Sequence, residues 1–366
     1  MTRQQEAIRE IRINPIVPSE SVLVSTARGM RPHKAEEPAP RDTRRHVERC
    51  PFCTGNEHMT PPTLAAYPDE KDWRIRIVEN LYPVLGDDSA GTTLMMGLQQ
   101  AIDGYGRHEV IVDHAEHGIA LHEMSHEHLE MLLGAYRDRM QTLYDADARI
   151  RYVLAFKNFG PAAGASIAHT HSQIIAMPVV PENVYNEVAH SREHYRKHRG
   201  CIFCALIDEA LTFEATLYDR ESGSIRRRIS VGQYVVERGD RFIAIKPFAS
   251  RFEWEVHILP LRHQSDFLAL DTAGRSDLAR VLSRTMARLD AVIGDAQYNF
   301  FLHSLPRSPE LADCEASYHW HLEICPRTSI PTGFELGSGL SVNTISPEDA
   351  AERLRSVHLQ DNAHAS

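Results

Sequence analysis

FKNFGPAAGASIAHTHSQ, residues 156–173, places two histidines, His169 and His171, one residue apart after a run of small residues. A second pair, His319 and His321, stands in HWHLEICP at residues 319–326, at an offset of 150 residues. Side chains alternate between the two faces of a strand, so residues two apart point the same way. Each pair is therefore expected to lie on a strand and to share one face.

The repeat extends beyond the histidine pairs. HEVIVDHAEH (108–117) matches WEVHILPLRH (254–263), and RYVLAFKN (151–158) matches QYNFFLHS (297–304), all with the apolar, β-branched character of strands. Between these segments, apolar residues at helical spacing recur at an offset of 149 residues. They are Leu129, Leu132, Leu133, Met140, Leu143 and Tyr144 in the first half and Leu278, Val281, Leu282, Leu289, Val292 and Ile293 in the second.

This internal repeat predicts an α+β fold of two duplicated units, each an antiparallel sheet with a helix packed on one face. We expect an N-terminal half at residues 1–180 and a C-terminal half at residues 181–366. Proline-rich segments at 32–40 and 178–181 predict a flexible stretch and the connector between the halves. Residues 356–366 read as a polar tail.

The composition is that of a soluble globular protein, with 42% hydrophobic and 25% charged residues. No apolar run approaches the roughly 20 residues that span a bilayer, and the N-terminus lacks the apolar core of a secretory signal. A cytoplasmic enzyme that does not enter the membrane is expected. The net charge of -10 argues against a nucleic-acid-binding protein, although a few local arginines can still bind a small phosphorylated substrate.

Four of the six cysteines form two C-x-x-C pairs, CPFC at 50–53 and CIFC at 201–204. In an intracellular chain such pairs are more often metal or redox sites than disulfides. The repeat adds two histidines to each pair, which completes the ligand set of a closed, structural zinc site. Two zinc ions per chain are expected, the first held by Cys50, Cys53, His117 and His169, the second by Cys201, Cys204, His263 and His319. A competing second site without sulfur comprises Glu187, His303, His319 and His321.

If His169 is a metal ligand, His171 is left free beside it and is suited to act as a nucleophile or general base near neutral pH. Small residues just upstream allow a ligand to approach the backbone, and neutral side chains nearby can donate hydrogen bonds to an oxyanion. This combination indicates a phosphoryl or nucleotidyl transfer site. The residues concerned are Gly160, Gly164, Ser166, Asn158 and Gln173. The alternative is a pair of core histidines that only fill space.

The stretch at 156–173 resembles the active-site signature of the galactose-1-phosphate uridylyltransferase family, a transferase branch of the histidine-triad superfamily. Further matching motifs bring the resemblance to roughly residues 15–356. They are VSTARGMRP (24–32), CPFCTGNE (50–57), IVENLYPVL (77–85), GRHEVIVDHAEH (106–117) and GFELGSGLSVNTISPEDAAERLR (333–355). The resemblance implies a homodimer of duplicated half-barrels, with active sites near the subunit interface.

The resemblance also implies a mechanism. His171 would attack the α-phosphorus of a nucleoside diphosphate sugar, forming a nucleotidyl-histidine and releasing sugar 1-phosphate. A second sugar 1-phosphate would then take the nucleotide by the reverse step. Gln173 would hydrogen-bond the phosphoryl oxygens, and Ser166 and Asn158 would contact the phosphates.

Other motif positions acquire substrate-binding roles by the same resemblance. Arg28 and Arg31, in the pattern R-x-x-R-P, would clamp phosphate. Asn80 and Tyr82, in ENLYP, would pack around the nucleoside. Glu335, in GFE, would lie on the sugar side.

Position 173 distinguishes transferases from hydrolases by its chemistry. Hydrolases of the histidine-triad superfamily carry a third histidine there, which can protonate a poor leaving group. A sugar phosphate is a good leaving group, so the neutral Gln173 suffices. In the second half, Glu323 takes this position and would repel phosphate. We therefore expect one catalytic centre per chain and a degenerate C-terminal half.

The expected activity is UDP-glucose:hexose-1-phosphate uridylyl transfer, as in galactose metabolism. HTHSQIIAMPVVP (169–181) and the complete second C-x-x-C also resemble the related ADP-glucose phosphorylase branch, which passes AMP to inorganic phosphate. Transfer of another nucleotide from a nucleotide sugar is a third alternative, because stacking on a residue such as Tyr82 does not select the base. An alternative of another class is a non-catalytic, zinc-stapled nucleotide-binding protein.

Overall fold

The computed structural model describes residues 8–30, 41–88 and 91–359. Ten strands form its main sheet, five from each half of the chain. Those of the first half are β3 (Thr63–Tyr67), β4 (Ile75–Glu79), β7 (Arg107–Val112), β8 (Tyr152–Phe159) and β9 (His171–Met177). Those of the second half are β12 (Val235–Arg238), β13 (Phe242–Ile245), β14 (Val256–Pro260), β15 (Tyr298–His303) and β16 (His321–Pro326).

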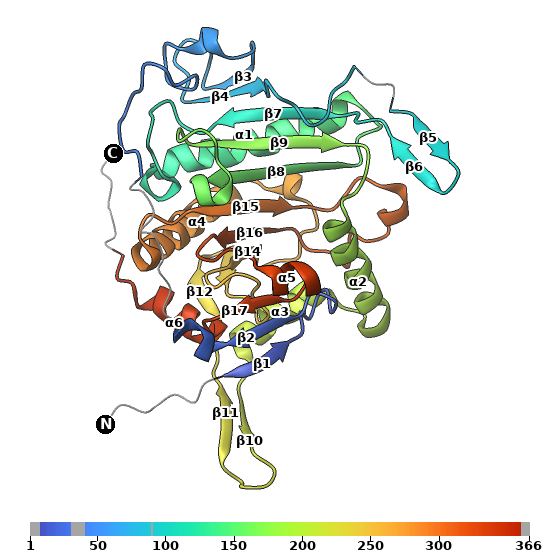
Figure 1. The fold of residues 1–366 in the computed structure, drawn as a ribbon, viewed down its shortest axis with the longest axis vertical. Coiled ribbons are helices and arrows are strands. Elements are labelled where there is room, and N and C mark those ends of the chain that lie inside the picture. Colours follow the sequence, from blue (N-terminus) through green and yellow to red (C-terminus); the bar gives the residue numbers. More distant parts are fainter. Residues whose placement is uncertain (1–7, 31–40, 89–90, 360–366) are drawn as a thin grey trace.

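The strands follow the order β12-β13-β14-β16-β15-β8-β9-β7-β4-β3, and every neighbouring pair is antiparallel. The two halves meet where β8 pairs with β15, so one continuous sheet runs through both (Figure 1). The predicted α+β fold with antiparallel sheet is confirmed. The boundary between residues 180 and 181 stays a prediction, although the proline-rich connector does lie between β9 and the next helix.

Two long helices, α1 (His126–Ala146) and α4 (Thr272–Ile293), pack against each other and cover one face of the sheet (Figure 1). The Ser125 hydroxyl caps α1 and the Asp271 carboxylate caps α4, each accepting a hydrogen bond from the first turn. The apolar faces predicted at the 149-residue offset form the core of this layer: Leu129 and Leu278, for example, are fully buried.

Each histidine pair differs from the expectation of one shared strand. β9 begins at His171 and β16 at His321, so His169 and His319 stand just before their strands. The physical reason is local: the carbonyl oxygen of His169 accepts a hydrogen bond from the ring of His171 instead of joining the sheet.

Among the described residues, four further helices and three small sheets surround this core. Helices α2 (Glu182–His198) and α3 (Ile202–Thr212), which the repeat did not predict, follow the connector, and α5 (Gly333–Ser338) and α6 (Pro347–Ser356) lie near the C-terminus. A small sheet joins β1 (Arg9–Arg12), β2 (Val22–Ser25) and β17 (Ser341–Asn343). The remaining hairpins pair β5 (Thr93–Met96) with β6 (Gln99–Ile102) and β10 (Ala215–Tyr218) with β11 (Ile225–Ile229).

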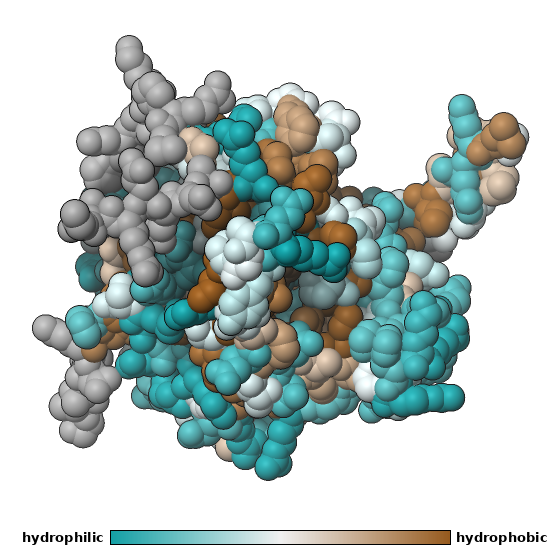
Figure 2. All heavy atoms as spheres, turned by 90° about the horizontal axis from the view of Figure 1, so that it is seen from below, coloured by the Kyte–Doolittle hydropathy of each residue, from teal (hydrophilic) through white to brown (hydrophobic). Residues whose placement is uncertain are grey.

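The β5–β6 hairpin is an arm that projects from the body and carries exposed apolar side chains (Figures 1 and 2). These include Leu94, Met95, Met96 and Leu98. Among the described residues, every helix is too short or too polar to traverse a bilayer. Arg31, the proline-rich segment at 32–40 and the end of the predicted tail, residues 360–366, lie outside the described residues.

Candidate functional site

The four predicted ligands of the first metal site come together in the structure. Cys50, Cys53, His117 and His169 are buried, and their ligand atoms lie within 4.8 Å of one another. The Nδ1 atom of His169 lies 3.6 Å from the sulfur of Cys50 and 3.5 Å from that of Cys53. Its Nε2 donates to the carbonyl oxygen of His114 at 2.7 Å, which fixes the ring as outer-sphere partners do in metal sites.

Burial raises the pKa of the Cys50 thiol to about 11. A bound cation would reverse that shift, because it stabilises the thiolate. Two sulfurs and two inward-facing imidazoles fit a tetrahedral metal ion.

The second cluster repeats this arrangement with more exposure. Cys201, Cys204, His263 and His319 again lie with their ligand atoms within 4.8 Å. Cys204 lies in the first turn of α3, and its sulfur is 3.4 Å from Nδ1 of His263 and 3.6 Å from that of His319. Both rings donate from Nε2 to backbone carbonyls, those of Glu315 and Pro260.

The competing sulfur-free set is only partly assembled as predicted. His319 faces the cysteines, so it does not join Glu187, His303 and His321. Its place in that cluster is taken by Glu323, whose carboxylate lies with the other three ligand atoms within 4.8 Å. Among the described residues, the cysteine-containing set and the sulfur-free set are therefore distinct clusters instead of two versions of one site.

His171 is held in the form that a nucleophile needs. Its Nδ1 lies 2.8 Å from the carbonyl oxygen of His169, and since a carbonyl only accepts, Nδ1 carries the proton. The neutral ring then has its lone pair on Nε2, for which no described residue provides a hydrogen bond. Burial lowers the pKa of His171, which favours this neutral form. The ring of Phe52 packs 5.3 Å from it, centroid to centroid.

A buried ion pair fixes the backbone of the same histidine. Lys157 on β8 donates to the Asp113 carboxylate at 2.6 Å, to the Thr170 hydroxyl at 2.8 Å and to the carbonyl oxygen of His171 at 3.0 Å. Asp113 also accepts from the Ser172 hydroxyl at 2.9 Å. Both charged side chains are fully buried, so each compensates the other.

The glycine-containing loop before His169 is supported by the second half of the chain. Gly160 has φ 85°, and a side chain there would collide with Gln297, whose amide oxygen accepts from the backbone of Ala162 at 2.7 Å. Asn299 on β15 donates to the side chain of Asn158 and to the carbonyl of Ala163, both at 2.8 Å. Predicted contact residues Ser166 and Gly164 are exposed on this loop. The loop is therefore shaped by residues of both halves.

Gln173 lies on β9, where its amide oxygen is 2.8 Å from Nε2 of His108 on β7. Asn80 follows β4 and also approaches His108, with its side-chain nitrogen 3.1 Å from the same Nε2. Tyr82, on the same loop, is 82% exposed. The predicted nucleoside side and the predicted phosphate side of the site thus meet at one histidine.

Arg28 and Glu335 lie elsewhere on the molecule. Arg28 is in the short 3-10 turn at Thr26–Met30 that follows β2, and Glu335 is in α5, next to β17. Hydrogen bonds from Thr332 lower the pKa of Glu335, and the charge of Arg28 contributes weakly in the same direction. Among the described residues, no hydrogen bond, ion pair or ring contact joins Arg28 or Glu335 to His171 of the same chain.

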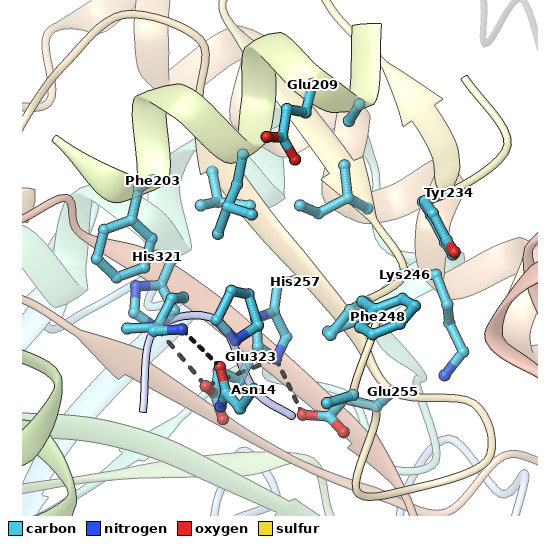
Figure 3. A pocket seen from close by; sticks show the side chains of 18 of the residues that line it. Asn14, Phe203, Glu209, Tyr234, Lys246, Phe248, Glu255, His257, His321 and Glu323 are labelled. Carbon is cyan, nitrogen blue, oxygen red and sulfur yellow. Dashed lines mark hydrogen bonds and ion pairs between the residues drawn. The ribbon is translucent and has the colours of Figure 1, made fainter. Parts of the chain in front are cut away.

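The second half has a cavity of about 350 Å³ beside His321, and several of its charged and histidine side chains interact with one another (Figure 3). Arg251 forms ion pairs with Glu323 and Glu255, and His257 lies 3.0 Å from Glu255. Burial would raise the pKa of Glu323, yet Arg251 lowers it well below its usual range, so the carboxylate is charged.

His321 differs from His171 in its neighbours, although Nδ1 again faces the carbonyl oxygen two residues earlier, at 3.1 Å. Its Nε2 lies 3.6 Å from Glu323 and 3.7 Å from Glu187. Two carboxylates thus face the nitrogen that corresponds to the free Nε2 of His171. The fixed negative charge of Glu323 also opposes a phosphate.

Sequence reasoning missed several of these contacts. Lys157, His108, Gln297 and Asn299 carry no motif of their own, and their roles depend on strand register. One signal was present: both C-x-x-C pairs have phenylalanine at their third position, and Phe203 packs on His321 as Phe52 packs on His171, at 5.2 Å between ring centroids.

The family model described as Galactose-1-phosphate uridyl transferase, N-terminal domain, matches residues 1–181. The chain is 30% identical to an ADP-glucose phosphorylase of Arabidopsis thaliana, over 96% of this chain and 93% of the relative. It is 28% identical to a galactose-1-phosphate uridylyltransferase of Thermotoga maritima, over 96% of this chain and 99% of the relative.

Among solved structures, similarity extends over the whole fold. A crystal structure of an ADP-glucose phosphorylase from Arabidopsis thaliana with bound ADP-glucose superimposes with a TM-score of 0.79 at 28% identity, covering 96% of this chain and 100% of that one. A uridylyltransferase structure gives a TM-score of 0.68 at 27% identity, with 95% and 97% covered.

The buried ion pair behind His171 gives a stability prediction. Lys157→Met leaves the Asp113 charge buried without its partner and should lower the free energy of unfolding by about 3–5 kcal/mol, measured by denaturant titration. Lys197→Met, which removes the exposed partner of Glu193, should cost at most about 0.5 kcal/mol. Adding Asp113→Asn to Lys157→Met should recover part of the loss. Equal costs for the two lysine variants would contradict the assignment.

Proposed function

Because this chain belongs to the galactose-1-phosphate uridylyltransferase family of nucleotidyltransferases, we propose that it transfers AMP from ADP-glucose to inorganic phosphate through a covalent intermediate on His171. The observation that carries the chemistry is the geometry of His171, whose Nδ1 proton is engaged and whose Nε2 lone pair is free. The choice of nucleotide rests on similarity to ADP-glucose phosphorylase, which is slightly greater in sequence and in fold than similarity to the uridylyltransferases.

In the first step, Nε2 of His171 attacks the α-phosphorus, and the bond from that phosphorus to the bridging oxygen breaks. The bridging oxygen and its electron pair leave with glucose 1-phosphate, and the histidine carries AMP. In the second step, an oxygen of inorganic phosphate attacks the same phosphorus and displaces His171, giving ADP. Gln173, Ser166 and Asn158 would hydrogen-bond the phosphoryl oxygens, and their donors gain strength as charge develops there.

Uridylyl transfer between sugar 1-phosphates, which the sequence analysis placed first, is the second candidate. It uses the same His171 chemistry with UDP-glucose as donor and a hexose 1-phosphate as acceptor. The similarity to uridylyltransferases over nearly the whole chain supports it. The exposed Tyr82 offers a stacking surface that does not discriminate between bases.

Labelling with α-³²P donors tests both candidates. ADP-glucose, UDP-glucose and GDP-sugars are supplied in turn, and protein-bound, acid-labile radioactivity is measured. We expect label from ADP-glucose, discharged as ADP by inorganic phosphate, and no label on His171→Gly. Label from UDP-glucose alone, discharged only by hexose 1-phosphate, would favour the second candidate. If no donor labels the protein, it is a non-catalytic binding protein and the proposal is wrong.

We propose that zinc occupies the two cysteine–histidine clusters and ties the segments that carry the cysteines to the sheet. Both closed ligand sets leave no position for a reacting water, so the role is structural. Elemental analysis should show that Cys50→Ser and Cys201→Ser each lose about one metal ion per chain, while Cys314→Ser, outside the clusters, loses none. If Glu187→Gln loses a metal ion and Cys201→Ser does not, the second ion lies in the sulfur-free cluster.

A homodimer would explain why Arg28 and Glu335 lie apart from His171. We propose that each active site takes these two residues from the partner subunit, and that the exposed apolar β5–β6 arm contributes to the contact. Subunit exchange between His171→Gly and Arg28→Ala proteins, each inactive alone, should then restore activity, because a mixed dimer contains one intact site. Absence of recovery, or a monomer in sedimentation, would contradict this arrangement.

A further inference from the structure

His108 contacts both the loop that carries Asn80 and the side chain of Gln173. It lies on β7 with only 7% of its surface exposed, and its ring reaches the side chain of Gln173 on β9. The loop that follows β4 contacts the same residue twice. Asn80 donates its backbone N–H to the His108 carbonyl oxygen at 2.9 Å, and Val84 donates its backbone N–H to Nδ1 at 3.2 Å.

These contacts select one tautomer of the ring. A backbone N–H can only donate, so Nδ1 accepts from Val84 and the proton of the neutral ring is on Nε2. Burial lowers the pKa of His108, which keeps the ring neutral. Nε2–H therefore donates to the amide oxygen of Gln173 at 2.8 Å. In this tautomer Nε2 carries a hydrogen and cannot accept a hydrogen bond from the Asn80 side-chain nitrogen, which lies 3.1 Å away.

The hydrogen bond from His108 determines which end of the Gln173 amide faces the substrate. A glutamine amide has an accepting end and a donating end of nearly the same shape, and phosphoryl oxygens only accept. A freely rotating amide would present its oxygen to the phosphate in part of the population. With the oxygen engaged by His108, the NH2 group is the end left for substrate.

We propose that His108 is a positioning residue for nucleotidyl transfer, orienting the Gln173 amide toward the phosphoryl group and tying it to the Asn80–Val84 loop. This inference rests on the proposed function and adds a physical link to it. Because one ring holds both segments, displacement of the loop that carries Tyr82 would release Gln173. The nucleoside side of the site is thereby coupled to the phosphoryl side.

A double-mutant cycle on the labelling rate tests this role. Gln173→Ala should slow nucleotidylation of His171 on the order of tenfold to a hundredfold, as loss of an oxyanion donor does. His108→Leu should slow it by a similar factor, and the double variant should be no slower than Gln173→Ala. His108→Gln, whose amide N–H can replace Nε2–H, should recover most of the rate. Independent, multiplying effects, or a His108→Gln protein as slow as His108→Leu, would overturn the proposal.

A spectroscopic measurement keeps the inference separate from folding and from the proposed function. In wild-type protein labelled with ¹⁵N-histidine, the His108 ring should show the Nε2–H tautomer near neutral pH, and Gln173→Ala should shift its Nε2 resonance. An Nδ1–H tautomer, or a resonance insensitive to Gln173→Ala, would overturn the positioning role even if the enzyme is active. If no nucleotide sugar labels the wild-type protein, the proposed function is wrong. The spectrum would still show whether the His108–Gln173 hydrogen bond exists.

Discussion

The hydrogen bond between the ring of His171 and the carbonyl oxygen of His169 is the constraint on which the site depends. It uses the Nδ1 proton of one histidine and removes the backbone of the other from the sheet. The ring of His169 itself turns its Nδ1 toward the sulfurs of Cys50 and Cys53. The two neighbouring imidazoles thus have different surroundings: His169 faces the cysteine cluster, and His171 keeps a free Nε2 lone pair. Lys157 donates a hydrogen bond to the carbonyl oxygen of His171 at the start of β9.

The second half has the same backbone arrangement around its histidine pair but different side chains beside it. His321 repeats the hydrogen bond of His171, and Phe203 repeats the packing of Phe52. Glu323, however, replaces the neutral Gln173 and forms an ion pair with the partly exposed Arg251. The cations that could have met a phosphate are used to neutralise carboxylates, so the second half supports the first. Asn299 and Gln297, which shape the glycine loop, are part of that support.

Much of the fold was predictable from the sequence because duplication leaves several independent marks. The offset of 149 residues between apolar positions predicted α1 and α4, and the four cysteine–histidine ligands of each cluster were found from the repeat alone. Contacts between single side chains on paired strands were not predictable, since they depend on register: His108 meets Gln173 only because β7 and β9 pair as they do. The sulfur-free cluster was assigned with His319 instead of Glu323 for a related reason. Spacing cannot tell which way a residue just outside a strand will turn.

The account assigns covalent chemistry to one of two similar histidines, and mapping the nucleotide adduct tests that assignment most directly. Wild-type protein is incubated with ADP-glucose without acceptor, kept at neutral pH, digested, and sequenced by tandem mass spectrometry. We predict that AMP is attached to His171 and that the peptide containing His321 is unmodified. An adduct on His321, or on any residue other than His171, would contradict the account.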